Sequence, residues 1–276
     1  MTTLLKTLAW TLAAAFLLNA GQTGDPYNYP IDAPRLESAP AIDGNLAEWR
    51  EHAFSDGVWD IARIAKTPWY DSERNRLTVH SDEPSADEDL SARYYIAWDD
   101  EYLYLGAEVR DNVNDVADPA HEPKRWYFKD AICWFIEAPR SNAAKNFGEG
   151  DHAFCFVIDS KRPPYAAWWR HGAPGKTYIE EPIPAGAVDY SVKMTGHQGD
   201  FTLEARVAMK PTLGAGSPQW GAPKAGDLYG LEIVHTDPDG GDYGGHFIIY
   251  GTGDDDSTWG LMELAPPVGP IERKSN

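Results

Sequence analysis

The feature that most constrains the fold is a short acidic turn, Asp99-Asp100, with alternating side chains on both sides of it. Every second residue from Leu103 to Val109 is apolar, so these side chains share one face of an extended chain, and Tyr104 and Glu108 share the other. Such alternation is typical of half-buried strands, and a short polar turn is typical of a hairpin loop. This part of the chain therefore predicts two paired antiparallel strands.

Further alternating segments follow at short spacing, separated by turns rich in Gly, Pro and Asp. This spacing of strands and turns predicts an all-β protein. The expected fold is a two-sheet antiparallel β-sandwich that is jelly-roll-like and carries long surface insertions. Residues 55–90 have few periodic apolar positions and an acidic end, so we interpret them as one such insertion. The predicted strands are 93–98, 101–110, 131–138, 153–159, 165–170, 190–196, 201–208, 229–236 and 246–250.

The N-terminal 20 residues resemble an export signal. Lys6 precedes an apolar run from Leu8 to Leu18, and small residues follow it. The run is too short to span a bilayer comfortably, although an uncleaved anchor is an alternative. We expect a secreted or periplasmic protein with residues 1–20 as signal peptide and 21–40 as an extended leader. The sandwich then covers residues 41–265, and residues 266–276 form a polar tail.

The formal net charge of −19 at pH 7 limits the partners. Nucleic acid and anionic membranes require a basic surface, so neither is expected beyond the signal peptide. Divalent cations suit this charge, because carboxylates at alternate positions of a glycine-containing turn supply the oxygen ligands that Ca²⁺ prefers. Ordinary solvated turns are the alternative. The candidate calcium ligands in these turns are Asp111, Asp115, Asp237, Asp239 and Asp242, and the run Asp254-Asp255-Asp256 is a further acidic candidate.

Several phrases stand in an order that resembles carbohydrate-binding module family nine and its DOMON-like relatives. The match runs from about Ala41 to Leu264. The resemblance implies two packed antiparallel sheets, one with a concave face that holds a sugar between two aromatic rings. It also implies structural calcium near the turn at Asp43. The phrases are AIDGNLAEW, YIAWDDEYLYLGAEVRDNV, WYFKDAICWFIE, HAFCFVID, FTLEARVAM, YGLEIVHTD and WGLMEL.

By this resemblance, Trp126 and Tyr250 are the two stacking rings. The family's acidic sugar ligand falls at Cys133, and Cys155 falls at an arginine-like ligand position on the next strand. The predicted cleft floor is therefore largely apolar, with Phe135 and Glu137 beside the cysteines. These cysteines are expected either to form a disulfide or to remain two free buried thiols, and an exported protein permits the disulfide.

A second aromatic segment, Trp168-Trp169-Arg170, offers further surface to a ligand. Alternation along a strand puts only one of the two tryptophans in the core. The other either contacts a ligand or packs under the predicted insertion.

The leading hypothesis is an exported, non-catalytic module that recognises a sugar or polysaccharide by aromatic stacking. A DOMON-like domain for haem or another apolar ligand is an alternative, with Met194 and Met209 as the available axial ligands. A polysaccharide-acting enzyme that uses Glu137 and Asp130 is a third possibility. The sequence contains no HExxH, G-x-S-x-G, Walker or C-x-x-C motif.

Overall fold

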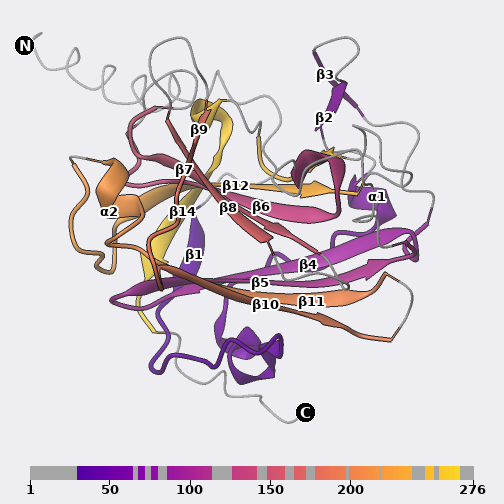
Figure 1. Cartoon of the computed structure of the whole chain (residues 1–276), viewed down its shortest axis with the longest axis horizontal. Helices are drawn as coiled ribbons and strands as arrows, with labels where there is room; N and C mark the ends of the chain where they lie inside the picture. The colour runs from indigo at the N-terminus through magenta and orange to yellow at the C-terminus, as the bar shows by residue number, and fades with distance from the viewer. Residues whose placement is uncertain are drawn as a thin grey trace, which may run out of the picture.

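The protein is a sandwich of two stacked β-sheets, as the sequence predicted (Figure 1). We analysed it as a computed structural model. The described residues are 30–64, 68–71, 76–79, 86–113, 126–141, 148–158, 165–171, 178–196, 199–217, 219–237, 246–251 and 255–267.

The larger sheet contains ten strands. They are β1 (Ile31–Pro34), β2 (Pro68–Asp71), β3 (Arg76–Val79), β6 (Ala131–Glu137), β7 (Asp151–Val157), β8 (Tyr165–His171), β9 (Tyr178–Glu181), β12 (Leu228–Thr236), β13 (His246–Ile248) and β14 (Gly260–Ala265). The main order is β3-β2-β13-β12-β6-β7-β8-β9, and β14 pairs with both β12 and β1. Only the β1–β14 pair is parallel among these described pairs.

The smaller sheet contains β4 (Leu90–Trp98), β5 (Tyr102–Asp111), β10 (Val188–Met194) and β11 (Phe201–Ala208), in the antiparallel order β10-β11-β5-β4. Its β4–β5 hairpin confirms the prediction around the acidic turn. The Asp99 carboxylate accepts hydrogen bonds from the backbone N–H groups of Glu101 at 2.8 Å and Tyr102 at 2.7 Å, which closes the turn.

The main core lies between the two sheets and follows the predicted alternation. From β5 it receives the apolar side chains of Leu103, Leu105 and Val109, and from β6 and β7 it receives Trp134 and Phe156. The residues between them point to the outer faces, because successive side chains of a strand alternate. Each sheet therefore has a second face that needs its own cover.

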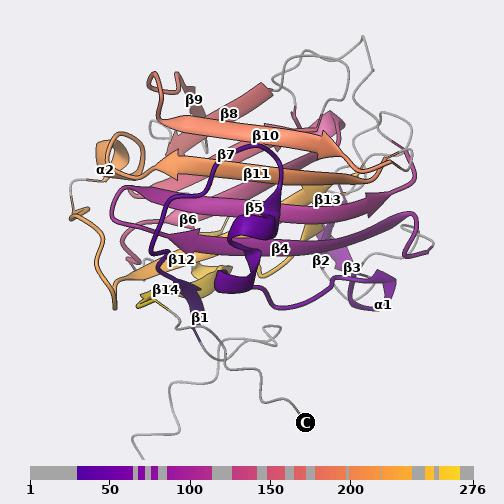
Figure 2. The same ribbon diagram turned by 90° about the horizontal axis from the view of Figure 1, so that it is seen from below.

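The segment around Gly44 covers the outer face of the smaller sheet (Figure 2). It includes two short 3-10 helices, η1 (Leu46–Glu48) and η2 (Arg50–His52). Buried Glu204 of β11 fastens this segment: it accepts hydrogen bonds from the backbone N–H of Asp43 at 2.9 Å and of Gly44 at 2.8 Å, and from Trp49 Nε1 at 2.7 Å. Gly44 has φ +83°, a conformation that favours glycine. These contacts give a physical reason for the Asp43, Gly44 and Trp49 positions of the AIDGNLAEW phrase.

The prediction that residues 55–90 form a surface insertion is wrong for their first part. Trp59 and Ile64 are buried in the main core, and Trp59 exchanges two backbone hydrogen bonds with Ala92 of β4. Ile64 ends the short helix α1 (Ile61–Ile64). The isolated aromatic and apolar residues of this segment lack a visible period, so no pattern indicated their burial.

Three more short elements complete the described part of the chain: η3 (Trp126–Phe128), α2 (Leu213–Gly216) and η4 (Asp256–Thr258). Strand β1 lies inside the segment expected as an extended leader, and its Ile31 and Ala33 are buried. No helix within the described ranges is long and apolar enough to cross a membrane.

Candidate functional site

Cys133 and Cys155 mark the centre of the outer face of the larger sheet. They stand directly opposite each other on β6 and β7 and are joined by a disulfide, with their Cα atoms 4.0 Å apart. Of the two expected alternatives, a disulfide or two free buried thiols, the structure contains the disulfide. Both residues are fully buried, and Phe135 beside them is 3% exposed. The floor of the predicted cleft is therefore apolar and enclosed.

Aromatic rings lie over this floor, and we call the floor and these rings together the outer cluster. Its marginal residues Tyr127, Tyr165 and Trp169 are half-buried, and its other members are buried. The Trp126 ring centroid lies 5.6 Å from that of Tyr127 and 5.9 Å from that of Trp169, both in edge-to-face geometry. The buried members are Trp126, Ala131, Cys133, Phe135, Ala153, Cys155, Val157, Ala167, Val234, Ile248 and Trp259.

Polar side chains border the accessible rings along β8 and β9. Tyr165 donates its hydroxyl hydrogen to Glu180 Oε1 at 2.8 Å, and burial followed by this carboxylate raises the pKa of Tyr165. The margin therefore combines apolar ring faces with donors and acceptors, the two kinds of group that a sugar requires. Arg170 and Glu181 form an ion pair at 2.7 Å on the other face of the sheet, because Glu181 is paired with core-facing Trp168 and the Arg170 guanidinium lies over the Trp168 ring. The sequence-based prediction of Arg170 as a ligand residue on this face is therefore not supported.

Trp168 is the tryptophan of β8 that faces the core. Its ring lies nearly parallel to that of Phe154, at 6.3 Å, and to that of His152, at 5.9 Å. Its Nε1 donates to His152 Nδ1 at 3.1 Å. Burial, followed by the Arg170 charge, lowers the pKa of His152 to about 3. Trp169 is thus the ring that alternation turns outward, and Trp168 contributes to the core.

Tyr250 does not join Trp126 in the outer cluster; it packs against the main core and is 9% exposed. Its backbone N–H donates to Glu232 Oε1 at 3.0 Å. Glu232 also accepts from the backbone N–H groups of Ile233, Ile249 and Gly251. Glu232 lies where one side of β12 changes its partner strand from β14 to β13. At this junction some backbone N–H groups have no carbonyl acceptor on a neighbouring strand. Burial raises the pKa of Glu232 to about 8, against the effect of these donors.

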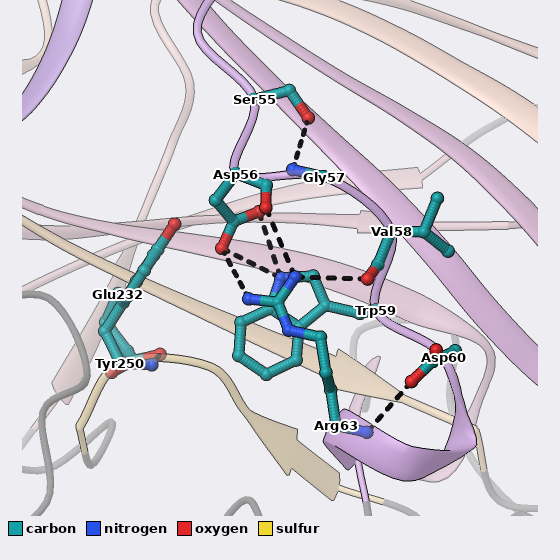
Figure 3. A network of polar contacts seen from close by, with 9 residues as sticks. All are labelled: Ser55, Asp56, Gly57, Val58, Trp59, Asp60, Arg63, Glu232 and Tyr250. Atoms are coloured by element: carbon teal, nitrogen blue, oxygen red, sulfur yellow. Dashed lines mark hydrogen bonds and ion pairs between the residues drawn. The ribbon is translucent and has the colours of Figure 1, made fainter.

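A polar network lies beside Glu232 and Tyr250 (Figure 3). The Arg63 guanidinium carbon lies 3.8 Å from the Trp59 ring centroid, and Arg63 Nη2 lies 3.2 Å from Asp56 Oδ2. Trp59 Nε1 also donates to the Asp56 carboxylate, at 3.0 and 3.1 Å. The network holds Trp59 and α1 against the core.

Glu137 is also committed to structural contacts. It is 1% exposed and accepts hydrogen bonds from Arg140 Nη1 at 2.6 Å and from the backbone and hydroxyl of Ser141. Phe135 packs against Trp259, with ring centroids 5.6 Å apart. Neither residue presents an open surface on the sheet.

Two of the predicted calcium ligands come together. Carboxylate oxygens of Asp111, Asp237 and Asp130 lie within 4.8 Å of one another, and all three residues are buried. Sequence reasoning did not include Asp130 as a ligand, because its approach to Asp237 depends on the pairing of Ala131 with Thr236. Asp43 instead accepts a hydrogen bond from the backbone of its own turn, at Asn45, at 2.9 Å. Asp115, Asp239, Asp242 and Asp254 lie outside the described residues.

The residues proposed for the two alternative functions do not assemble into sites. Met209 is fully buried in the main core, and Met194 packs against the same core from β10, so neither lies in the outer cluster. Asp130 and Glu137 lie at opposite ends of β6, roughly 23 Å apart along the strand. Paired glycosidase carboxylates are about 5–10 Å apart, so these two do not flank one bond.

A separate groove of about 750 Å³ lies on the outer face of the smaller sheet, beside η2. Two of its charged groups pair with each other: Arg50 contacts Glu108 at 2.6 Å, and Tyr95 donates its hydroxyl hydrogen to the same carboxylate at 2.5 Å. Tyr95 is 5% exposed. Accessible aromatic faces are concentrated on the outer cluster rather than in this groove.

The chain was compared with known families and structures. The family described as Carbohydrate family 9 binding domain-like matches residues 56–265. Two solved structures of a family 9 carbohydrate binding module from Caldicellulosiruptor kristjanssonii, in complex with cellotriose and with glucose, share its fold with TM-scores of 0.55 and 0.54 at 17% and 16% identity. The matches cover 88% and 87% of this chain and 100% and 99% of theirs. None of the curated proteins searched matches. Because the family match spans most of the chain, the protein belongs to the Carbohydrate family 9 binding domain-like family.

Proposed function

We propose that this protein is an exported, non-catalytic carbohydrate-binding domain that holds a sugar against the margin of its outer cluster. The observation that carries the proposal is the group of half-buried rings, Tyr127, Tyr165 and Trp169, around Trp126. Sugar C–H faces stack on such rings. The predicted signal peptide and the disulfide support export, because disulfides persist in oxidising compartments.

The ligand class follows from the family and from the chemistry of the margin. The two structural relatives carry glucose and cellotriose, so glucose-containing oligosaccharides are the proposed ligands. The disulfide floor offers no charged grip to sugar hydroxyls. In this proposal Glu180 and the hydroxyl of Tyr165 supply the hydrogen bonds from the border of the rings.

Isothermal titration with glucose, cello-oligosaccharides and a panel of other glycans tests the proposal. We expect W169A to weaken binding about tenfold or more, equivalent to about 1.4 kcal/mol, because it removes an accessible stacking face. W220A is the matched control, since Trp220 is also half-buried but packs against the main core. The proposal fails if folded wild-type protein gives no heat with any sugar.

We also propose that the predicted calcium ion binds at Asp111, Asp130 and Asp237. Three buried carboxylates supply only hard oxygen ligands, which suit Ca²⁺. The ion would hold the ends of β5, β6 and β12 together. Calcium added to EDTA-treated protein should raise the thermal midpoint, and D130N should lose part of that gain. A midpoint that calcium does not change would refute this part.

A further inference from the structure

A second group of buried carboxylates lies at the end of β6 that is remote from Asp130. Glu137 is the last residue of β6, Asp151 is the first residue of β7, and the two are directly opposed in the sheet. Asp256 approaches them from η4, and oxygens of all three carboxylates lie within 4.8 Å of one another. The three residues are only 1%, 1% and 2% exposed. Asp256 belongs to an acidic run that the sequence already marks as a calcium candidate, whereas Glu137 and Asp151 carry no such prediction.

Among the described residues, one positive side chain faces this group. Arg140 Nη1 donates to Glu137 Oε2 at 2.6 Å and to the backbone carbonyl of Asp256 at 2.7 Å. The Glu137 carboxylate is further oriented by Ser141, and Asp151 Oδ2 accepts the backbone N–H of Gly148. When all three carboxylates are ionised, this single guanidinium of the described neighbours leaves two negative charges without compensation.

Two carboxylate oxygens in this group accept no hydrogen bond. They are Asp151 Oδ1 and Asp256 Oδ1, both buried. A buried carboxylate oxygen without a donor is costly, so each such atom requires an explanation. A cation bound among the three carboxylates would give both oxygens a partner.

We propose that Glu137, Asp151 and Asp256 form a calcium site of this protein. The donor set is entirely carboxylate oxygen, which favours Ca²⁺ and disfavours zinc or copper, whose preferred ligands are nitrogen and sulfur. A divalent ion also matches the two uncompensated negative charges. Water and backbone carbonyls complete the six to eight oxygen ligands that calcium takes.

The proposed ion would join three chain segments that are distant in sequence. Glu137 and Asp151 fix the ends of neighbouring strands, and Asp256 belongs to η4, which directly precedes Trp259 of the outer cluster. Calcium at this point therefore holds η4, and with it Trp259, against Phe135. The site goes beyond the proposed sugar binding, because its occupancy is measured without any sugar.

Calcium titration of the EDTA-treated full-length chain tests the site, in a D130N background that disables the other acidic group. D130N should still bind calcium, and D130N/D151N and D130N/D256N should bind it about tenfold more weakly or not at all. An additional D32N substitution is the matched control, because Asp32 is exposed, and it should change nothing. Binding by D130N/D151N equal to that by D130N, or no binding by folded D130N, would overturn the proposal.

Thermal unfolding distinguishes a calcium-binding role of Asp151 from a purely structural role. In EDTA, D130N/D151N should be at least as stable as D130N, since the amide removes an uncompensated buried charge. In millimolar calcium the order should reverse, because only D130N gains stability from the ion. A structural role for Asp151 without calcium predicts the same difference in both buffers, and that result would contradict the proposal.

Discussion

Cys133 and Cys155 are directly opposed on β6 and β7 and covalently joined on the outer face of the larger sheet. The resemblance to family nine modules places sugar-gripping polar residues at these two positions. In this protein the disulfide replaces that grip with a covalent apolar floor. Recognition of sugar hydroxyls is therefore expected to shift toward the border formed by Tyr165 and Glu180.

Removal of the disulfide in a C133A/C155A variant should destabilise the fold by about 3 kcal/mol. The bond closes a loop with a sequence separation of 22, and its loss increases the conformational entropy of the unfolded chain. Equilibrium guanidinium unfolding measures the change. Wild-type protein unfolded in excess reductant is the control and should approach the stability of the variant. Equal stability of oxidised wild type and the double variant would contradict this prediction.

Alternation along single strands predicted the faces of this fold correctly. Ile132 and Phe154 point to the core while Cys133 and Cys155 point outward, because the side-chain period of a strand is two wherever it runs. The same reasoning required one of the two tryptophans of β8 to face outward. The general fold could therefore be predicted from the sequence. The disulfide could not, because alternation gives the face of each cysteine but not the register that brings the two side chains within bonding distance.

Contacts between different segments of the chain could not be predicted in this way, because the side-chain period of one strand does not determine which segment packs against it. The partner of Trp126 is Trp169 rather than Tyr250, because Glu232 binds the backbone around Tyr250 where β12 changes its edge partner. The approach of Asp256 to Glu137 likewise depends on how η4 packs against the end of β6. Such contacts arise from strand register and loop paths, which the pattern of one sequence does not encode visibly.

Gly106 should tolerate no side chain, because it lies under the segment that covers the smaller sheet. A Cβ atom at this position would lie 2.9 Å from Leu46 Cδ2 and 3.1 Å from Trp49 Cζ2. We expect G106A to lower the free energy of unfolding by about 1–3 kcal/mol through overpacking. The matched control is G221A, since no atom lies within 4 Å of a Cβ at Gly221. Equal stability of the two variants in urea unfolding would disprove the close packing.

His152 should make the protein less stable in acid. Its folded-state pKa is lowered to about 3 from 6.5, so the unfolded chain binds its proton first as the pH falls. The stability that the neutral imidazole contributes is full above pH 6.5 and is lost as the pH falls toward 3. Relative to H152Q, wild-type protein should therefore lose about 1.4 kcal/mol per pH unit between pH 6 and 4.

Urea unfolding of both proteins at several pH values measures this difference. H52Q is the control, because His52 is exposed and its substitution should leave the pH profile unchanged. A difference between wild type and H152Q that stays constant from pH 7 to 4.5 would show that the buried imidazole is protonated as easily in the folded protein as in the unfolded one.

Glu232 should produce the opposite pH dependence. Its folded-state pKa is raised to about 8 from 4.5, so its contribution is full below pH 4.5 and is lost as the pH rises through 8. At pH 5, E232Q should be about 1–3 kcal/mol less stable than wild type, because its NH₂ group cannot accept the hydrogen bond from the Gly251 N–H. This deficit should shrink as the pH rises to 8, by up to about 1.4 kcal/mol per unit.

Exposed Glu180 provides the control E180Q, whose difference from wild type should not follow this profile. Because Glu232 and His152 act with opposite signs between pH 4.5 and 6.5, their effects partly cancel in wild-type protein. A flat wild-type profile is therefore compatible with two strongly shifted groups, and only the variant differences separate them. An E232Q deficit that grows as the pH rises would instead show that the four backbone donors keep Glu232 ionised in the folded protein.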